Sequence, residues 1–112
     1  MKFISAMEAH KYENGPTCVA FEYETGNPDI NIARVEISGR YPETGYAANT
    51  AVTELVYVES GTGMVTVEDK HTTLNKGDVV LIEKGEQVYW EGTLTLIIAC
   101  TPAWYPEQYE NT

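Results

Sequence analysis

Residues that could hold a metal ion are few in this sequence. A transition-metal site needs several imidazole, thiolate or carboxylate ligands that converge on one point. The chain has only two histidines, His10 in a polar N-terminal stretch and His71 directly after Glu68-Asp69-Lys70, where a hairpin end should face solvent. These positions do not suit a shared centre, so the sequence predicts neither a metal site nor a cofactor.

The possible nucleophiles are two cysteines, Cys18 and Cys100. Both lie in apolar runs, which raise the pKa of a thiol and lower its reactivity. We interpret them as reduced, buried structural residues and not as a disulfide. No arrangement of serine or cysteine with histidine suggests a catalytic triad. Gly61-Thr62-Gly63 is not a phosphate-binding loop, because no helix follows it.

Arginine is the side chain best suited to bind a carboxylate or phosphate, through two parallel hydrogen bonds. Arg34 alternates with Glu36 along a strand pattern, which favours an ion pair over ligand binding. Arg40 precedes an irregular stretch and is the better candidate to contact an anionic substrate.

The elements that must position these groups are all strands. From Glu54 onwards apolar and polar residues alternate, with Val56 and Val58 on one face and Leu55 and Tyr57 on the other. Glycine-rich turns interrupt the pattern about every ten residues, the first of them a predicted hairpin loop at Ser60-Gly61-Thr62-Gly63. No stretch has a helical period. The chain therefore predicts an antiparallel barrel or sandwich with strands at residues 17–24, 30–38, 54–58, 64–68, 79–82, 88–90 and 94–100.

Two spacings resemble the motifs of the cupins. Glu54 and Gly61 have the spacing that ends the first cupin motif, and Gly77 followed by Asp78 to Ile82 and the turn Glu83-Lys84-Gly85 resembles the second. The resemblance covers roughly residues 33–104. It implies an all-β, cupin-type double-stranded β-helix, a jelly-roll barrel, in a single domain over residues 1–112. The barrel core would span about 17–100, and an aromatic, proline-rich tail 101–112.

The resemblance also shows what is missing. The metal-binding histidines of the first motif would fall at Ala48 and Thr50, or at Ala47 and Asn49, and that of the second motif at Val88. Of the four ligands only Glu54 remains, so we expect a metal-free barrel. Two interpretations of Glu54 stay open. It is either a hydrogen-bond acceptor for a neighbouring loop, or a general base or ligand acceptor with a pKa raised by burial.

Aromatic side chains suggest what the barrel holds. Val88 takes the position at which cupins point a ligand inward, so alternation turns Trp90 into the mouth and Tyr89 away from it. A pocket with rings and one carboxylate suits an apolar or ring-shaped small molecule such as a sugar. Alternatively the rings fill the space of the lost metal site and pack a dimer interface. The candidate ligand-binding residues are Arg40, Tyr46, Asn49, Thr50, Glu54, Val88, Trp90 and Trp104.

Charge and composition limit the partners. The net charge of -10 repels nucleic-acid phosphates and anionic membranes, so neither is an expected partner. The N-terminus lacks the apolar segment of a signal peptide, and we expect a cytoplasmic protein. The resemblance implies a homodimer.

We predict a metal-free cupin that binds a sugar-like or other small metabolite. One alternative is a metal-independent isomerase or epimerase with Glu54 as general base and a tyrosine as acid. Another is a cupin that holds a metal through substituted ligands.

Overall fold

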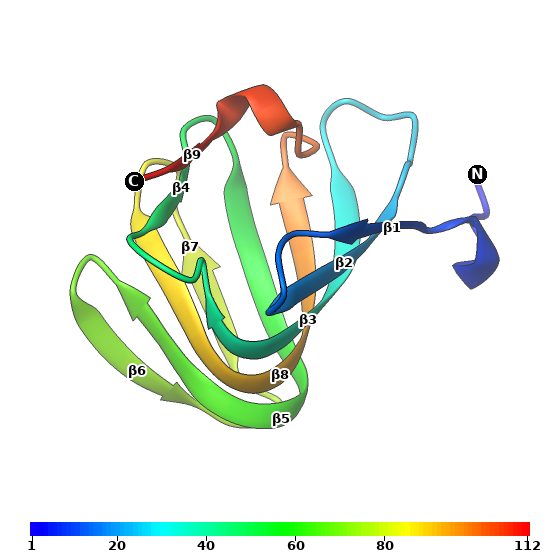
Figure 1. Ribbon diagram of the computed structural model, residues 1–112. Coiled ribbons are helices and arrows are strands. Elements are labelled where there is room, and N and C mark those ends of the chain that lie inside the picture. Colours follow the sequence, from blue (N-terminus) through cyan, green and yellow to red (C-terminus); the bar gives the residue numbers. More distant parts are fainter.

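A computed structural model describes residues 1–112 and shows an all-β chain whose nine strands form one curled sheet (Figure 1). No helix is long and apolar enough to cross a membrane. Two short 3-10 helices, η1 and η2, flank the strands near the two ends of the chain. The elements are η1 (Ala6–Glu8), β1 (His10–Glu13), β2 (Cys18–Tyr23), β3 (Asn31–Tyr41), β4 (Ala47–Asn49), β5 (Thr53–Val67), β6 (Lys70–Leu74), β7 (Val79–Ile82), β8 (Gln87–Thr101), η2 (Pro106–Gln108) and β9 (Tyr109–Asn111).

β5 and β8 are the two central, longest strands of the sheet, and they pair antiparallel from Thr53↔Thr101 to Val67↔Val88. On the far side of β8, β3 pairs with its second part and β4 with its beginning. The sheet order is β1-β2-β3-β8-β4-β9, and β5 also pairs with β6 and β7. This arrangement curls the sheet into the open barrel seen in Figure 1.

The predicted hairpin loop at Ser60-Gly61-Thr62-Gly63 is wrong. β5 continues through this stretch as one strand, with a register shift between Val58 and Ser60. The glycines allow a close approach and not a reversal: a Cβ on Gly63 would lie 2.2 Å from the carbonyl oxygen of Glu91 on β8. The predicted strands at 88–90 and 94–100 are likewise one strand, β8, which continues through Gly92. Gly92 also permits a close approach, because a Cβ there would lie 2.6 Å from Gly63 Cα.

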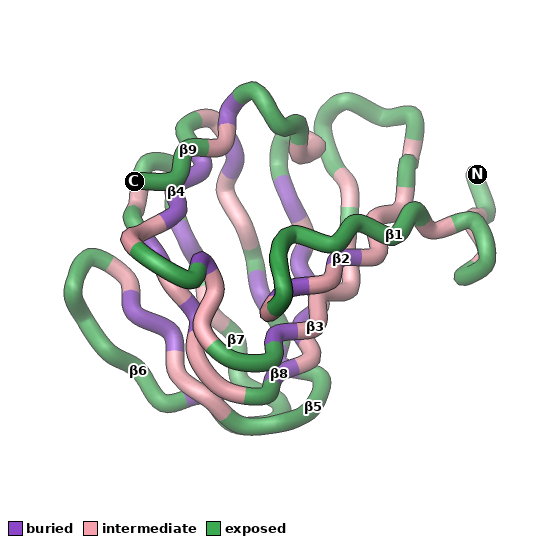
Figure 2. The backbone as a smooth tube through the Cα atoms, viewed as in Figure 1, coloured by how far each residue is buried: buried purple, intermediate pink, exposed green.

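The core lies on the inner face of the curled sheet. The alternation read from the sequence is confirmed, because Val56 and Val58 are fully buried while Leu55 and Tyr57 are about half exposed. On β8 the same alternation buries Leu94, Leu96, Ile98 and Cys100. Figure 2 shows these buried segments in the middle of the curved sheet, with β1 and β6 exposed.

The opposite face of the sheet carries apolar side chains that the chain itself does not cover. Strand register places them in two neighbouring rows across five strands, with Leu55 of β5 and Leu81 of β7 half exposed in the first. We call this surface the outer apolar face. Its rows are Leu81, Leu55, Ala99, Ile32 and Tyr23, and Val79, Tyr57, Ile97, Arg34 and Phe21.

The two ends of the chain contribute elements that alternation did not reveal. β1 pairs with β2 along an edge of the sheet, in a region predicted to be only polar and turn-rich. β9 pairs with β4, which lies in a stretch predicted to be irregular. The tail that contains η2 and β9 thereby runs across one end of the barrel (Figure 1).

Candidate functional site

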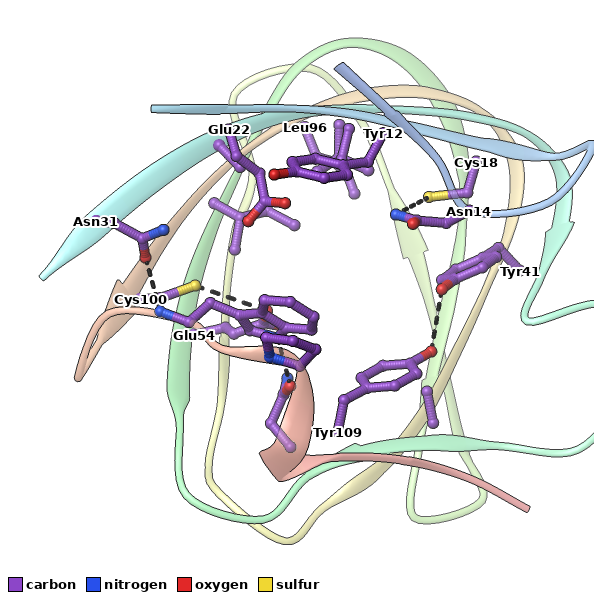
Figure 3. A pocket seen from close by; sticks show the side chains of 18 of the residues that line it. Tyr12, Asn14, Cys18, Glu22, Asn31, Tyr41, Glu54, Leu96, Cys100 and Tyr109 are labelled. Atoms are coloured by element: carbon purple, nitrogen blue, oxygen red, sulfur yellow. Dashed lines mark hydrogen bonds between the residues drawn. The ribbon is translucent and has the colours of Figure 1, made fainter. Parts of the chain in front are cut away.

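The inner face encloses a cavity of about 490 Å³, and 17 of the 25 residues that line it are hydrophobic. Its walls come from β2, β3, β5 and β8, and the tail after β8 closes part of its opening. Small-molecule sites typically occupy about 300–1,000 Å³, with apolar walls and a few polar groups. Figure 3 shows the polar side chains that point into this space.

Glu54 is one of these polar groups. It lies on β5 directly across from Cys100 of β8, whose thiol donates to Glu54 Oε2 at 3.8 Å. Burial raises the pKa of the Glu54 carboxyl to about 7, against smaller opposing effects of hydrogen bonds from Cys100 and Asn49. Near neutral pH this side chain therefore exists in both protonation states, as a proton acceptor or a hydrogen-bonding acid requires.

Asn49 fixes the tail to the barrel. Its Oδ1 atom accepts hydrogen bonds from Trp104 Nε1 at 2.9 Å and from Gln108 Nε2 at 2.7 Å. The Gln108 Oε1 atom in turn accepts from the backbone N–H of Ala51 at 3.2 Å. Because the Asn49 oxygen already has two donors, this residue chiefly positions Trp104 at the cavity wall.

Two tyrosines form a second polar group in the cavity. The hydroxyls of Tyr41 on β3 and Tyr109 on β9 lie 3.0 Å apart, on the side of the cavity away from Glu54 (Figure 3). Burial, and the hydrogen bond with Tyr109, raise the pKa of Tyr41. Burial also raises the pKa of Tyr109. Both phenols therefore stay protonated. One hydroxyl donates to the other, which leaves the second hydroxyl free to donate a hydrogen bond to a ligand.

The N-terminal strands supply a further carboxylate. Cys18, Ala20 and Glu22 alternate on the inward face of β2, and Glu22 points into the cavity (Figure 3). Burial, and secondarily the charge of Glu24, raise the pKa of Glu22. The free thiol of Cys18 accepts from Asn14 Nδ2 at 4.0 Å, and burial raises its pKa to about 11. Both cysteines are buried and free, and both line the cavity.

Five of the predicted ligand-binding residues line this cavity. The expected orientation of β8 is confirmed, because Val88 and Trp90 are 5% and 6% exposed and face inward. Tyr89 lies outside, where its ring contacts Tyr46 and Arg40. The five lining residues are Asn49, Glu54, Val88, Trp90 and Trp104.

The structure does not bring Arg40, Tyr46 or Thr50 to the cavity wall. The Arg40 guanidinium donates to the carbonyl oxygens of Pro42 and Gly45 at 2.7 and 3.1 Å, and it lies 3.8 Å from the centre of the Tyr89 ring. It thus holds the loop after β3, so the expectation that it meets an anionic substrate in the barrel does not fit its position.

Tyr46 and Thr50 are also engaged in contacts within the chain. The Tyr46 hydroxyl donates to Asp69 Oδ1 at 2.6 Å, and the Thr50 hydroxyl donates to the carbonyl oxygen of Gln108 at 2.7 Å. They flank β4, one residue before and one residue after it, and neither lines the cavity, which the irregular sequence between Gly39 and Asn49 did not reveal. Arg34 forms an ion pair with Glu36 of its own strand at 3.2 Å, and it also lies 3.8 Å from Glu59 of β5.

Sequence reasoning missed several lining residues. Glu22 had a detectable signal, because it shares the inward parity of Cys18 and Ala20 and is the one charge on that apolar face. Tyr41 and Tyr109 had none, since their contact depends on the tail returning to pair with β4.

The residues present do not fit the metal of the cupins. No group of three or more histidine, cysteine, aspartate or glutamate side chains lies close enough together to hold an ion. Beside Glu54 the lining residues at the expected ligand positions are Ala47, Asn49 and Val88, and the Asn49 oxygen is already bonded twice. This donor set lacks the imidazoles that a transition metal prefers.

Comparisons with solved structures agree on the fold. A nucleoside dehydratase from Streptomyces superposes with a TM-score of 0.88 at 15% identity, over 100% of this chain and 92% of that chain. KdgF from Halomonas superposes with a TM-score of 0.74 at 18% identity, over 91% and 94% of the two chains. Oxalate decarboxylase from Bacillus subtilis gives 0.81 at 11% identity, over 96% of this chain and 31% of that chain.

A search of curated proteins found no match. A family model described as "Cupin domain" matches residues 40–97, about half of the sequence. Together with the curled antiparallel sheet, this match shows that the chain belongs to the cupin family, and it does so without the histidines that hold the metal in that family.

Proposed function

We propose that this cupin binds a small, ring-containing organic molecule in its barrel. The observation that carries the proposal is the 490 Å³ cavity, in which aromatic and aliphatic walls surround a few polar groups. A chain of 112 residues gains stability by filling such a space, so an open cavity of this size is better explained by a ligand than by packing. Trp90 and Trp104 provide flat surfaces for a ring.

The fold neighbours support a ring-shaped ligand without identifying it. The Streptomyces structures include variants of the dehydratase with uridine, which combines a sugar with a planar base. Nucleosides, free sugars and aromatic metabolites are therefore the ligand classes with which we would begin. Tyr41 or Tyr109 can donate to a hydroxyl or carbonyl oxygen of such molecules, and Glu54 can accept from a hydroxyl.

Proton transfer by Glu54 is the second candidate function. A carboxyl with a pKa of about 7 can remove a proton and return it near neutral pH, and the protonated phenols lie on the other side of the same cavity. This arrangement suits a metal-independent isomerase or epimerase. It would be recognised by solvent deuterium entering a carbon of the ligand in heavy water, with Glu54→Gln abolishing exchange but retaining binding.

The test of binding begins with native mass spectrometry of the purified protein, which detects a ligand carried from the cell. Thermal shift and NMR titration with nucleosides, pentoses and hexoses follow. Ala33→Trp would place an indole in the cavity, whereas Ser38→Trp puts the same side chain on the exposed face of the same strand. We expect the first variant to lose binding and the second to keep it. Unchanged binding by Ala33→Trp would refute the site.

We also propose that two copies of the chain pair through the outer apolar face. Val79, Leu81 and Leu55 are 59%, 56% and 50% exposed there, on two neighbouring cross-strand pairs of β5 and β7. Such a cluster of exposed aliphatic side chains is unusual on the surface of a monomer. Among the ten residues of the face only Arg34 is charged, and its partners Glu36 and Glu59 already neutralise it. An exposed apolar surface of this kind can pack against a copy of itself about a two-fold axis.

A further inference from the structure

The charged side chains of the cavity wall are all of one sign. Glu22, Glu24 and Glu54 line it, and no lysine, arginine or histidine does. Glu24 lies 3.7 Å from His10, and His10 itself does not line the cavity. None of the four ion pairs in the structure involves Glu22 or Glu54. Neither inward-facing carboxylate therefore forms an ion pair, although His10, opposite Glu22 in the strand register, lowers the pKa of Glu22 against the larger effect of burial. Burial of a charge without an ion-pair partner is unfavourable.

Strand register places these two carboxylates on opposite sides of the inner face, with β3 and β8 between them. Glu22 of β2 is in line with Ala33 and Ile98, while Glu54 lies one row away and in line with Cys100. Figure 3 shows both side chains extending toward the interior from different strands. A small ligand in the cavity would thus meet negative charge from more than one wall.

Aromatic side chains form a large part of the cavity wall. Seven of the chain's twelve aromatic side chains line the cavity, and the face of such a ring attracts a cation that has lost its water. Carboxylates and ring faces in one cavity are a combination that favours positive charge. The seven are Tyr12, Tyr41, Trp90, Trp104, Tyr105, Tyr109 and, at the end of β2, where the outer apolar face meets the rim of the cavity, Tyr23.

Anionic and neutral ligands fit this cavity less well than a cation does. An anionic ligand such as a sugar phosphate would find no cationic side chain and would be repelled by the carboxylates. A neutral ligand would leave Glu22 and Glu54 without a counter-charge. The net charge of -10 adds a long-range attraction for cations and a repulsion of anions.

We propose that the cavity selects an organic cation, a protonated amine or quaternary ammonium group carried on a small ring or alkyl body. This inference rests on the proposed function, since it takes the cavity as the ligand site, and it adds the charge of the ligand. The cationic group lies between the Glu22 and Glu54 carboxylates, and the body of the ligand lies against the aromatic wall.

The test compares probes that share a shape and differ in charge. One set is tyramine, para-ethylphenol and the anion para-hydroxyphenylacetate. The other is choline, its neutral tert-butyl analogue 3,3-dimethylbutanol and the anion 3,3-dimethylbutanoate. Binding is followed by NMR titration near pH 8, where Glu54, whose pKa burial raises to about 7, is mostly ionised. Because charge-assisted contacts are strong, we expect the cation of each set to bind at least about tenfold more tightly than the neutral probe. The anion should bind most weakly.

Two variants assign the preference to the carboxylates. Glu54→Gln and Glu22→Gln keep the shape of the side chain, and each should weaken tyramine binding about tenfold while leaving para-ethylphenol unchanged. The matched control is Glu83→Gln, which removes the same charge at an exposed turn after β7 and should change neither affinity.

The outcomes separate this inference from the proposed function. Equal binding of cationic and neutral probes, or tighter binding of the anion, would overturn the inference while the cavity remained a ligand site. A neutral or anionic ligand carried from the cell would do the same. If no probe bound at millimolar concentration and native mass spectra showed no ligand, the proposed function itself would fall, and the inference with it.

Discussion

Replacing Glu54 by glutamine should make this protein more stable above neutral pH. The pKa of the Glu54 carboxyl is about 7 in the folded chain, where burial disfavours its charge, and 4.5, its ordinary value, in the unfolded chain. The folded state therefore prefers the protonated form. The contribution of the protonated Glu54 carboxyl to the free energy of unfolding is complete below about pH 4.5 and is lost as the pH rises through about 7.

The size of the effect follows from the same two pKa values. Their difference corresponds to about 3 kcal/mol, a large part of the roughly 5–15 kcal/mol that stabilises a typical domain. Glutamine stays uncharged at every pH in this range, so its burial carries no penalty for a charge. Its amide oxygen can still accept from the Cys100 thiol. Near pH 5 we expect Glu54→Gln and the natural sequence to have similar stability, and near pH 8 the variant to be about 3 kcal/mol more stable.

Urea unfolding of both proteins, at intervals between about pH 5 and 8.5, measures this difference directly. Subtracting the two curves removes the titration of Glu22, which changes in the same direction in both proteins. Glu83→Gln serves as the control for a change in net charge, because that side chain is exposed. A difference curve that stays flat, or a variant less stable than the natural sequence at pH 8, would refute the assignment of Glu54 as a desolvated carboxylate.

Three further predictions concern the supports of the site. Asn49→Ala should cost about 2–4 kcal/mol in urea unfolding, because it leaves two buried donors unpaired, and it should shift tryptophan fluorescence to longer wavelength. Gly92→Ala should cost more than Gly77→Ala, since both residues have positive φ but only the Cβ at Gly92 would meet backbone, 2.6 Å from Gly63 Cα; equal losses would contradict the close approach of β5 and β8. Leu81→Lys should convert a dimer into a monomer in light scattering, and a natural chain that is already monomeric would exclude pairing through the outer apolar face.

The sequence predicted the fold well where a strand has one buried and one exposed face. Val56 and Val58 on β5, and Val88 and Trp90 on β8, all lie on the predicted side, because burial of one face imposes a period of two. The same rule failed at Ser60–Gly63, where glycines that permit two strands to approach look like the glycines of a turn. Local sequence does not distinguish these two uses.

The candidate site was harder to predict, because half of it depends on contacts between distant segments. Arg40 has the right chemistry for an anion, but the loop that follows it supplies the carbonyl groups that occupy its guanidinium. Tyr109 belongs to a three-residue strand, too short to show alternation. Its place opposite Tyr41 follows only from the pairing of β9 with β4.

Most residues that line the cavity lie outside the part of the chain that matches the family, so family membership does not identify a ligand. Eight of the 25 lining residues fall within residues 40–97, the part of the chain that matches the family, and seventeen lie outside it. The shared part of the sequence thus encodes the bent strands, while the first strands and the tail encode most of what a ligand would touch. Substitutions at the lining positions of these segments would change the cavity wall outside the part of the chain that matches the family. Two cupins with the same signature can therefore diverge in ligand while remaining recognisable as relatives.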